Sequence, residues 1–374
     1  MLFFVILISY IYAYTLLPST QLYFTFFIML YFCYFMFSTT SLFYLYLSYE
    51  ASLLPILYII VKWGSYPERS LRAIMLLIYT SVFTFPFIYI LFYWFSRHGS
   101  FIIITFPYSF SGLSLVFTVL AFITFAVKLP LYGLHFWLPI AHVEAPTFGS
   151  MILAGILLKL GGVGLLRISP ILSLSLLSTL VLSYLIFGLA FVTLICCFQS
   201  DLKRLVAYSS VSHMISIPIL LLSNYTLAFK GATMLIFFHG LSSPLLFICV
   251  GAIYSMYSTR QLILIRGMVL ISPLFTLVLI LSFVFTISTP PFPSYLSEIL
   301  FIVFSYSLTP YIIIPLLLFT FFSLVYNLNW LSSLVFFSPS PSISSVSQLT
   351  YRLFSPIIFS LVLCFPFLIF VSRF

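Results

Sequence analysis

Long apolar runs, separated by short groups of Pro, Gly, Ser and charged residues, follow one another along almost the whole chain. Most of them reach the length of about 17–25 residues that an α-helix needs to cross a bilayer. We therefore predict an all-α, polytopic membrane protein with about twelve membrane-spanning helices. The predicted ranges are 1–17, 20–37, 41–61, 71–95, 112–130, 146–167, 171–197, 204–222, 228–255, 268–304, 309–329 and 354–371.

Two of these helices are predicted to be broken. The run 268–304 is too long for one span and contains TPPFP at 289–293, where prolines remove backbone N–H donors. Pro130, Gly133 and Pro139 interrupt the chain directly after Lys128. Because a break within a membrane needs a polar or water-filled surrounding, each one indicates a site. Two breaks also suggest two inverted repeats, about 20–168 and 171–330, in a single membrane domain, 1–374, that ends with helix 354–371.

Composition supports the membrane assignment and limits the chemistry. Of the 374 residues, 63% are hydrophobic and 5% are charged, whereas soluble domains have roughly 45–50% and 25%. The net charge of +9 comes from scattered Lys and Arg, so we expect no nucleic-acid partner. The five cysteines lack metal or disulfide spacing, so no cofactor or metal is expected in this chain. The N-terminal run has no charged leader or cleavage site and is expected to remain as a helix.

Basic residues in the connections predict the orientation. Asp201 is expected to cap the helix that follows it, with Lys203 and Arg204 as charges outside the membrane. One side is predicted to carry Lys62, Arg69, Arg72, Lys203, Arg204, Arg260, Arg266 and Arg352. The other side is predicted to carry Arg97, Arg167, Lys230 and Arg373. The first set should face the cytoplasm or matrix, which places both termini on the opposite side.

Three ionisable residues in the first half lie inside predicted spans, where charge is costly and usually marks an ion pathway. Glu50 has no basic residue three or four positions away, so its partner must come from another helix. Lys128 precedes the first break, and Lys159 has an uncharged run on either side. A buried lysine gives up its proton readily, so both are candidates for proton transfer. The structural alternatives are a buried ion pair for Glu50 and an interfacial, snorkelling side chain for Lys128.

Three further candidates lie in the second half. His213 and His239 are each flanked by serines, and either side chain can carry protons or make an interhelical hydrogen bond. Glu298 follows the second break, where it can end a polar path or accept hydrogen bonds at the N-terminus of a half-helix. Around the first break we expect a loop, in which interfacial packing and function compete as roles for His135, His142 and Glu144.

The segments that contain these residues resemble the antiporter-like membrane subunits of respiratory complex I (NADH:ubiquinone oxidoreductase), in particular their mitochondrial subunit-4 branch. The resemblance extends from about Glu50 to Glu298. It rests on SYEASLLPILYIIVKWGSYPER, VKLPLYGLHFWLP, AHVEAPTFGSMILAGILLKLGGVGLLR, SDLKRLVAYSSVSHM and FFHGLSSPLLF. Because Glu50 arrives early, about two N-terminal helices of that family are expected to be absent from this chain.

The resemblance implies a proton-translocating subunit of the mitochondrial inner membrane, while other subunits oxidise NADH, reduce ubiquinone and hold FMN and iron–sulfur clusters. Expected partners are neighbouring antiporter-like subunits and membrane lipids. It assigns proton transfer to Glu50, Lys128, Lys159, His213, His239 and Glu298, and less strongly to His135. The leading hypothesis is an ion pair between Glu50 and Lys128 whose opening drives protons towards Glu298. The alternatives are a subunit of a multisubunit sodium/proton antiporter and a structural scaffold with an inactive channel.

Overall fold

The computed structural model describes residues 2–102, 115–170, 178–223, 225–290, 292, 294–308 and 310–336. Within these residues the chain is almost entirely helical, and its β contacts are two isolated bridges, Ser41–Ile102 and Asp201–Gln261. Eight helices are long and apolar enough to cross a membrane, and four shorter apolar helices accompany them. The prediction of an all-α, polytopic membrane protein is therefore confirmed.

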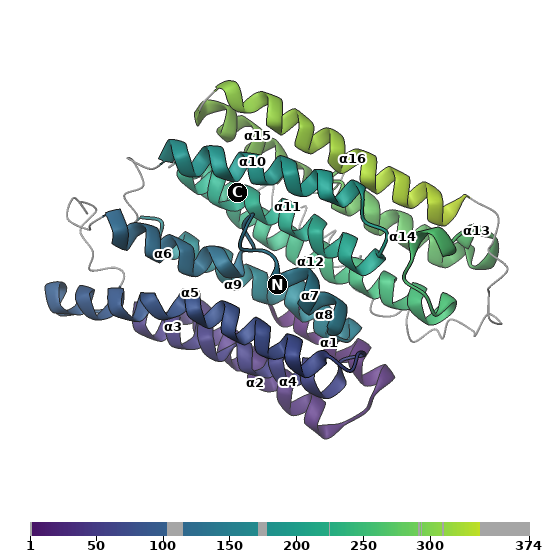
Figure 1. Ribbon diagram of the computed structural model, residues 1–374, viewed down its shortest axis with the longest axis horizontal. Helices are drawn as coiled ribbons and strands as arrows, with labels where there is room; N and C mark the ends of the chain where they lie inside the picture. Colours follow the sequence, from purple (N-terminus) through teal and green to yellow (C-terminus); the bar gives the residue numbers. More distant parts are fainter. Residues whose placement is uncertain are drawn as a thin grey trace.

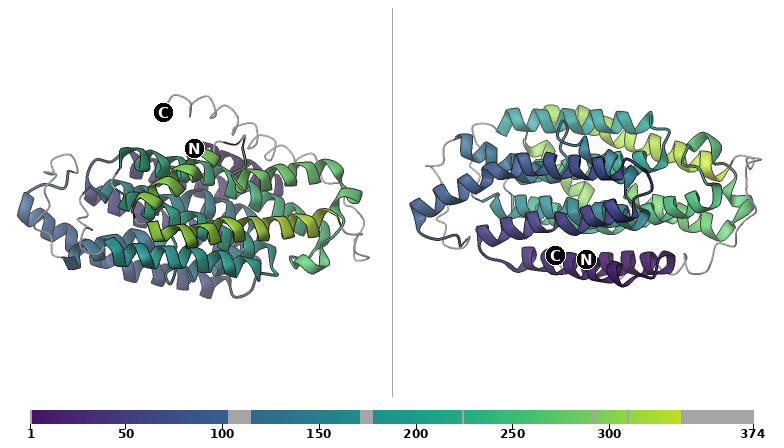
Figure 2. Two further views of the ribbon diagram at one scale, coloured as in Figure 1. Left: turned by 90° about the horizontal axis from the view of Figure 1, so that it is seen from above. Right: turned by 60° about the horizontal axis from the view of Figure 1, so that its bottom comes forward.

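The helices form one elongated bundle, in which α11 and α12 lie in the middle (Figures 1 and 2). The first half consists of α1 (Leu2–Leu16), α2 (Thr20–Ser38), α3 (Leu42–Ala51), α4 (Leu53–Trp63), α5 (Arg69–His98), α6 (Leu115–Lys128), α7 (Trp137–Glu144), α8 (Thr147–Ile152), the π-helix η2 (Leu153–Leu157) and α9 (Leu158–Ile168). The second half consists of α10 (Ser178–Cys197), α11 (Leu202–Leu222), α12 (Thr226–Tyr257), the 3₁₀-helix η3 (Leu262–Leu264), α13 (Met268–Ile271), α14 (Pro273–Thr286), α15 (Ser294–Leu308), the 3₁₀-helix η4 (Pro310–Ile312) and α16 (Ile313–Val335). Helix α6 packs on α9, the α8–η2–α9 segment packs on α12, and α12 packs on α15.

Both predicted breaks are present. The first is the turn region 129–136 between α6 and α7, where Gly133 adopts the left-handed conformation (φ +79°) that favours glycine. The indole N–H of Trp137 donates to the Val127 carbonyl at 3.0 Å and ties α7 to the end of α6. The second break separates α14 from α15, between Thr286 and Ser294. The π-helix η2 is a further irregularity that the sequence did not predict, and such turns are frequent at functional sites.

The predicted loop around His142 and Glu144 is wrong, because both residues belong to the buried helix α7. The loop was expected because Pro139 was taken as a helix breaker. Pro139 is the third residue of α7, however, where a backbone N–H has no intrahelical partner to lose. Helix α7 therefore carries both ionisable side chains into the bundle.

Asp201 caps α11 as predicted, because its carboxylate accepts from the Lys203 N–H at 3.0 Å. Lys203 is buried at this end of the bundle, with only 2% of the residue exposed, and its predicted place outside the membrane stays a prediction. Its ammonium donates to the carbonyls of Val143 and Ala145 at the end of α7. A helix end leaves such carbonyls without partners, which gives a buried lysine a binding site.

The described connections between helices lie at two ends of the bundle, and the two predicted sets of basic residues lie at different ends. At one end, the Ser65 N–H donates to the Glu144 carbonyl at 3.3 Å, and Arg260 donates to the Val143 carbonyl at 3.3 Å. At the other, Arg167 donates to carbonyls at the end of α2. Which end faces the matrix, and the positions of both termini, stay predictions. Helix 354–371, Arg352 and Arg373 lie outside the described residues.

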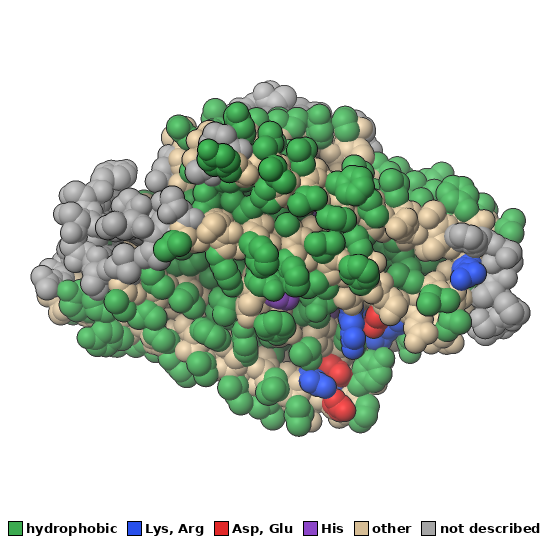
Figure 3. Space-filling model, turned by 45° about the horizontal axis from the view of Figure 1, so that its top comes forward, with side chains coloured by type: hydrophobic (Ala, Val, Ile, Leu, Met, Phe, Trp, Pro, Cys, Tyr) green, Lys and Arg blue, Asp and Glu red, His purple; other side chains and the backbone are tan. Residues whose placement is uncertain are grey.

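The surface is mainly apolar, and Figure 3 shows one face with few charged side chains, gathered near one end. Large hydrophobic side chains such as Tyr34, Tyr89 and Leu180 are exposed along the helices. An apolar face this extensive is suited to lipid or to other membrane helices. The polar side chains of interest are instead buried between helices. Whether the chain consists of two inverted repeats stays a prediction.

Candidate functional site

Lys159 and His239 form the first contact of a buried polar cluster. Only 1% of Lys159 is exposed, and its Nζ atom lies 2.7 Å from Nδ1 of His239 on α12. The same ammonium donates to the Ala154 carbonyl, which lies in η2. The lysine therefore has one partner that can accept a proton, the imidazole, and one that can only accept a hydrogen bond.

Helices α9 and α12 meet closely because η2 contains Gly155. A Cβ atom at this position would lie 2.6 Å from Cγ1 of Val5 on α1, 2.8 Å from Cγ of Pro244 and 3.4 Å from the carbonyl oxygen of Gly240, one residue beyond His239. Glycine removes this obstacle and allows the two helices to approach. The glycine at 155 thus brings the lysine helix to the histidine.

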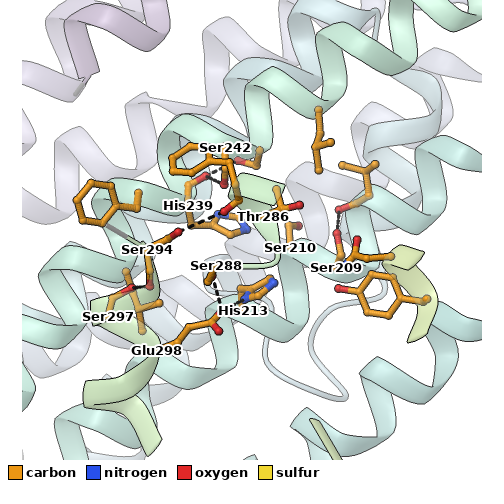
Figure 4. A pocket seen from close by; sticks show the side chains of 18 residues that line it. Ser209, Ser210, His213, His239, Ser242, Thr286, Ser288, Ser294, Ser297 and Glu298 are labelled. Carbon is orange, nitrogen blue, oxygen red and sulfur yellow. Dashed lines mark hydrogen bonds and ion pairs between the residues drawn. The ribbon is translucent and has the colours of Figure 1, made fainter. Parts of the chain in front are cut away.

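His213 on α11 and Glu298 on α15 form the other end of the cluster. His213 Nδ1 lies 3.6 Å from Oε1 of Glu298, and the Ser288 hydroxyl donates to the same oxygen at 2.7 Å. Ser288 lies in the second break and has φ +59°, an uncommon conformation for a residue with a side chain. Figure 4 shows the three side chains converging. The break between α14 and α15 therefore supplies Ser288 as a hydrogen-bond donor to Glu298.

A cavity of about 30 Å³ joins the two ends of the cluster. His213 and His239 line it, with ring centroids 5.8 Å apart, and so does Glu298. Apolar side chains and Asn327 form part of the lining, and nine hydroxyl-bearing residues contribute to it: Ser209, Ser210, Ser242, Ser243, Thr286, Ser288, Ser294, Ser297 and Tyr326. One water needs roughly 10–15 Å³ measured in this way, so the cavity accommodates about two. Lys159, His239, His213 and Glu298 thus form one series of ionisable side chains along the cluster, for which we use the name relay.

Among the described residues, the predicted ion pair between Glu50 and Lys128 is not formed in this structure, and whether it forms in another state stays a prediction. Lys128 is fully buried, and its ammonium donates to the Tyr49 carbonyl at 2.5 Å and lies 3.3 Å from the centre of the Tyr49 ring. Among the described residues, no basic nitrogen lies within 4.0 Å of the Glu50 carboxylate. Oε1 of Glu50 is buried and has no hydrogen-bond partner in the described chain. The carboxylate does remain within electrostatic range of Lys128.

The end of α3 explains why Lys128 binds a carbonyl. Helix α3 ends at Ala51, so the Tyr49 carbonyl lies in its last turn, where intrahelical partners are missing. The Ser52 hydroxyl donates to this same carbonyl at 2.8 Å. The ammonium over the Tyr49 ring gains a cation–π contact in addition. Together these contacts hold the Lys128 ammonium against Tyr49 at the end of α3.

His135, the weaker candidate, lies in the first break and away from the relay. Its ring stacks on Phe136, with centroids 4.7 Å apart, and on Tyr132 at 5.7 Å. Its Nδ1 atom is buried and has no hydrogen-bond partner among the described residues. The His135 ring therefore packs against aromatic rings and has a backbone hydrogen-bond partner at Leu131. Likewise, no group of His, Cys, Asp and Glu in the described part of the chain is arranged to hold a metal ion.

Residues 39–323 match the model of a family of transmembrane subunits described as NADH:quinone oxidoreductase/Mrp antiporter. The chain belongs to this family. Among curated relatives, chain 4 of NADH-ubiquinone oxidoreductase from Locusta migratoria is 38% identical over 296 residues, which is 78% of this chain and 66% of the relative. The same-named protein of Lumbricus terrestris is 37% identical over 305 residues, 80% of this chain and 67% of the relative. This member of the family thus matches about two thirds of the length of those relatives.

The fold of this antiporter-family chain also occurs in a solved structure. A chain of respiratory complex I from Thermus thermophilus with bound NADH is similar with a TM-score of 0.82 and 20% identity, covering 92% of this chain and 75% of that chain. At this identity the similarity concerns the fold. The resemblance to the antiporter-like subunits that the motifs indicated is confirmed.

Two residues of the site in this antiporter-family chain were not found from the sequence. Tyr326 lines the cavity, and its buried hydroxyl lies beside the Asn327 side chain, which lines the cavity too. Ser288 holds Glu298. With 26 tyrosines in the chain, nothing distinguished Tyr326, but the position of Ser288 directly before TPPFP was a usable signal.

Proposed function

We propose that the chain is a proton-translocating membrane subunit of a mitochondrial NADH:ubiquinone oxidoreductase, in which Lys159, His239, His213 and Glu298 carry the protons. The observation that supports this most is the contact of a fully buried lysine with an imidazole at 2.7 Å. Ionisable groups within membranes usually mark ion pathways, and this contact begins a series that crosses four helices. The complex's redox groups, FMN, iron–sulfur clusters and ubiquinone, belong in this proposal to partner subunits.

Each step moves one proton and leaves the covalent structure unchanged. The Lys159 ammonium gives a proton to Nδ1 of His239 and becomes a neutral amine. The His239 ring releases a proton from its other nitrogen through cavity water to His213, and the carboxylate of Glu298 receives it. The 3.6 Å separation between His213 and Glu298 exceeds direct hydrogen-bond length, so water in the cavity is the natural bridge.

In the first half of the chain, Glu50 and Lys128 act in this proposal as a charge switch. The Lys128 ammonium rests on the Tyr49 carbonyl, and the unpartnered Glu50 carboxylate is within electrostatic range. Movement of the ammonium from the carbonyl to the carboxylate would change the field at Lys159, because α6 and α9 are in contact. The ion pair between Glu50 and Lys128 is thus the second state of the switch. Glu50→Gln should therefore reduce proton pumping more than it reduces the amount of assembled complex.

The test is NADH-driven proton pumping by the complete complex, reconstituted in vesicles, with Lys159→Ala or Glu298→Gln in this subunit. Both variants should move fewer protons per electron pair and still assemble. Lys62→Ala is the matched control, because this lysine is exposed and its ammonium contacts the side chains of Tyr58 and Trp63 at the surface. Normal pumping by both relay variants would favour a scaffold with an inactive channel. Sodium-dependent transport without NADH oxidation would favour the antiporter function instead.

A further inference from the structure

Tyr49 contacts the Lys128 ammonium with its backbone and with its ring. The Tyr49 carbonyl accepts from the ammonium at 2.5 Å, and the centre of the ring lies 3.3 Å from Nζ. Tyr49 is 1% exposed and Lys128 is 0% exposed, so both contacts are made away from solvent. A cation over an aromatic face gains most where it is desolvated. Both contacts therefore favour the position in which Lys128 is separated from Glu50.

The Tyr49 ring is held in place by the helix that carries Lys128. The Tyr49 hydroxyl donates to the Thr124 carbonyl at 3.0 Å, one turn before Lys128 on α6. The ring also packs on Phe125, with centroids 5.1 Å apart. Because the hydroxyl is bonded and the ring is packed, an ammonium that moves to Glu50 leaves the ring behind.

Ser52 provides a second donor for the carbonyl on which the ammonium rests. Its hydroxyl is fully buried and donates to the Tyr49 carbonyl at 2.8 Å. A carbonyl oxygen has two lone pairs, so it accepts from the lysine and from the serine at the same time. A buried carbonyl without any donor costs free energy. With Ser52 in place, the carbonyl stays paired after Lys128 has left it.

Glu50 offers the ammonium its second position. It follows Tyr49 directly in the chain, and its buried Oε1 atom has no hydrogen-bond partner among the described residues. Its carboxylate is within electrostatic range of Lys128. The two positions of the ammonium thus belong to neighbouring residues of α3. The Tyr49 ring and the Ser52 hydroxyl act on the balance between these positions in opposite directions.

We propose that Tyr49 is a positioning residue, a latch that holds Lys128 apart from Glu50, and that Ser52 permits the release of the latch. This inference rests on the proposed charge switch and assigns the residues that set its balance. Loss of the ring should favour the ion pair by about 30-fold, the size of a desolvated cation–π contact. Loss of the Ser52 hydroxyl should favour the separated state by about fivefold, because the carbonyl then depends on Lys128 alone.

The experiment uses the complete complex in vesicles and measures protons per electron pair and the amount of assembled complex. Pumping is expressed as a share of the part that Lys159→Ala abolishes. Tyr49→Leu removes the ring and leaves the carbonyl, Tyr49→Phe removes only the hydroxyl, and Ser52→Ala removes the second donor. The matched control is Tyr257→Leu, because Tyr257 is 3% exposed and its hydroxyl also donates to a backbone carbonyl, at 3.1 Å.

The two shifts should partly cancel when they are combined. If pumping follows the less populated state of a balanced switch, it should fall by about 15-fold in Tyr49→Leu and by about threefold in Ser52→Ala. In the double variant the shifts oppose each other, so pumping should fall by only about 3.5-fold. Tyr49→Phe keeps the ring and should stay close to the unaltered complex. Tyr257→Leu should keep its protons per electron pair, with or without a loss of assembled complex.

Two packing defects would add rather than cancel. A double variant that pumps less than Tyr49→Leu would therefore overturn the latch, and so would a Tyr49→Phe variant as defective as Tyr49→Leu. If Glu50→Gln fails to pump while Tyr49→Leu pumps normally, the latch alone is overturned. Normal pumping by Glu50→Gln would overturn the charge switch and the latch together.

Discussion

Replacing Gly161 by alanine tests whether the close contact of the two lysine-bearing helices matters. Gly161 lies on α9, two residues after Lys159, and faces the end of α6. A Cβ atom at this position would lie 2.8 Å from the Leu129 nitrogen, 3.0 Å from the Phe125 oxygen and 3.1 Å from the carbonyl carbon of Lys128. All three are backbone atoms, which cannot rotate away. The helices must therefore separate until these contacts reach the ordinary 3.4 Å.

The expected cost follows from two opposing effects. Overpacking a close contact costs typically about 1–3 kcal/mol, and alanine recovers up to about 1 kcal/mol because it favours helix more than glycine does. With the full gain from alanine, the net loss is up to about 2 kcal/mol, or up to about 30-fold in the ratio of folded to unfolded protein. Gly162→Ala is the matched control, because its Cβ would meet the flexible end of Ile236 at 3.0 Å. That side chain can rotate, so the control should lose little stability.

The assay compares thermal inactivation of the reconstituted complex and its pumping at the growth temperature. Gly161→Ala should inactivate at a lower temperature than Gly162→Ala and pump fewer protons per electron pair, because the added atom displaces the backbone of Lys128. The reasoning would be refuted if the two alanine variants had the same inactivation temperature and pumping. In that case the α6–α9 contact would be loose enough to absorb a methyl group.

Three further substitutions test single contacts in the same complex. Tyr326→Phe removes only the hydroxyl of a residue that lines the cavity and should slow pumping. The control is Tyr257→Phe, which removes a hydroxyl that donates to a backbone carbonyl at 3.1 Å and should leave pumping unchanged. Equal pumping rates of the two variants would exclude the Tyr326 hydroxyl from the relay. Ser288→Ala removes a hydrogen bond to the Glu298 carboxylate worth about 1.5–3 kcal/mol, so pumping measured against quinone reduction in the same vesicles should fall by about 10- to 150-fold. An unchanged rate would mean that Glu298 does not need this hydroxyl to hold its orientation. Arg167→Met removes hydrogen-bond donors to backbone carbonyls at the end of α2. It should lower the inactivation temperature of the complex without changing the number of protons moved per electron pair. A pumping defect would contradict a purely structural role for Arg167.

Sequence reasoning found the features that are determined locally. Prolines remove hydrogen-bond donors wherever they stand, so TPPFP identified the second break, and the energetic cost of charge in a membrane singled out Lys159. Features that depend on packing were missed. The π-helix η2 has the ordinary apolar sequence LAGIL, and the choice of Lys128 between a carbonyl and Glu50 depends on where α3 ends. Pro139 misled because the effect of proline depends on its position in a helix.

The two buried lysines differ in what surrounds them, and this difference leads to a last prediction. Lys159 contacts an imidazole that can take a proton, whereas Lys128 contacts a carbonyl and an aromatic face that cannot. In the proposed mechanism Lys159 therefore loses its proton, whereas Lys128 needs only to carry a charge that moves. Arginine keeps its charge and stacks well on aromatic rings but does not release its proton. Lys128→Arg should accordingly retain more pumping than Lys159→Arg, and the reverse order, measured in the same vesicles, would mean that Lys128 itself passes protons.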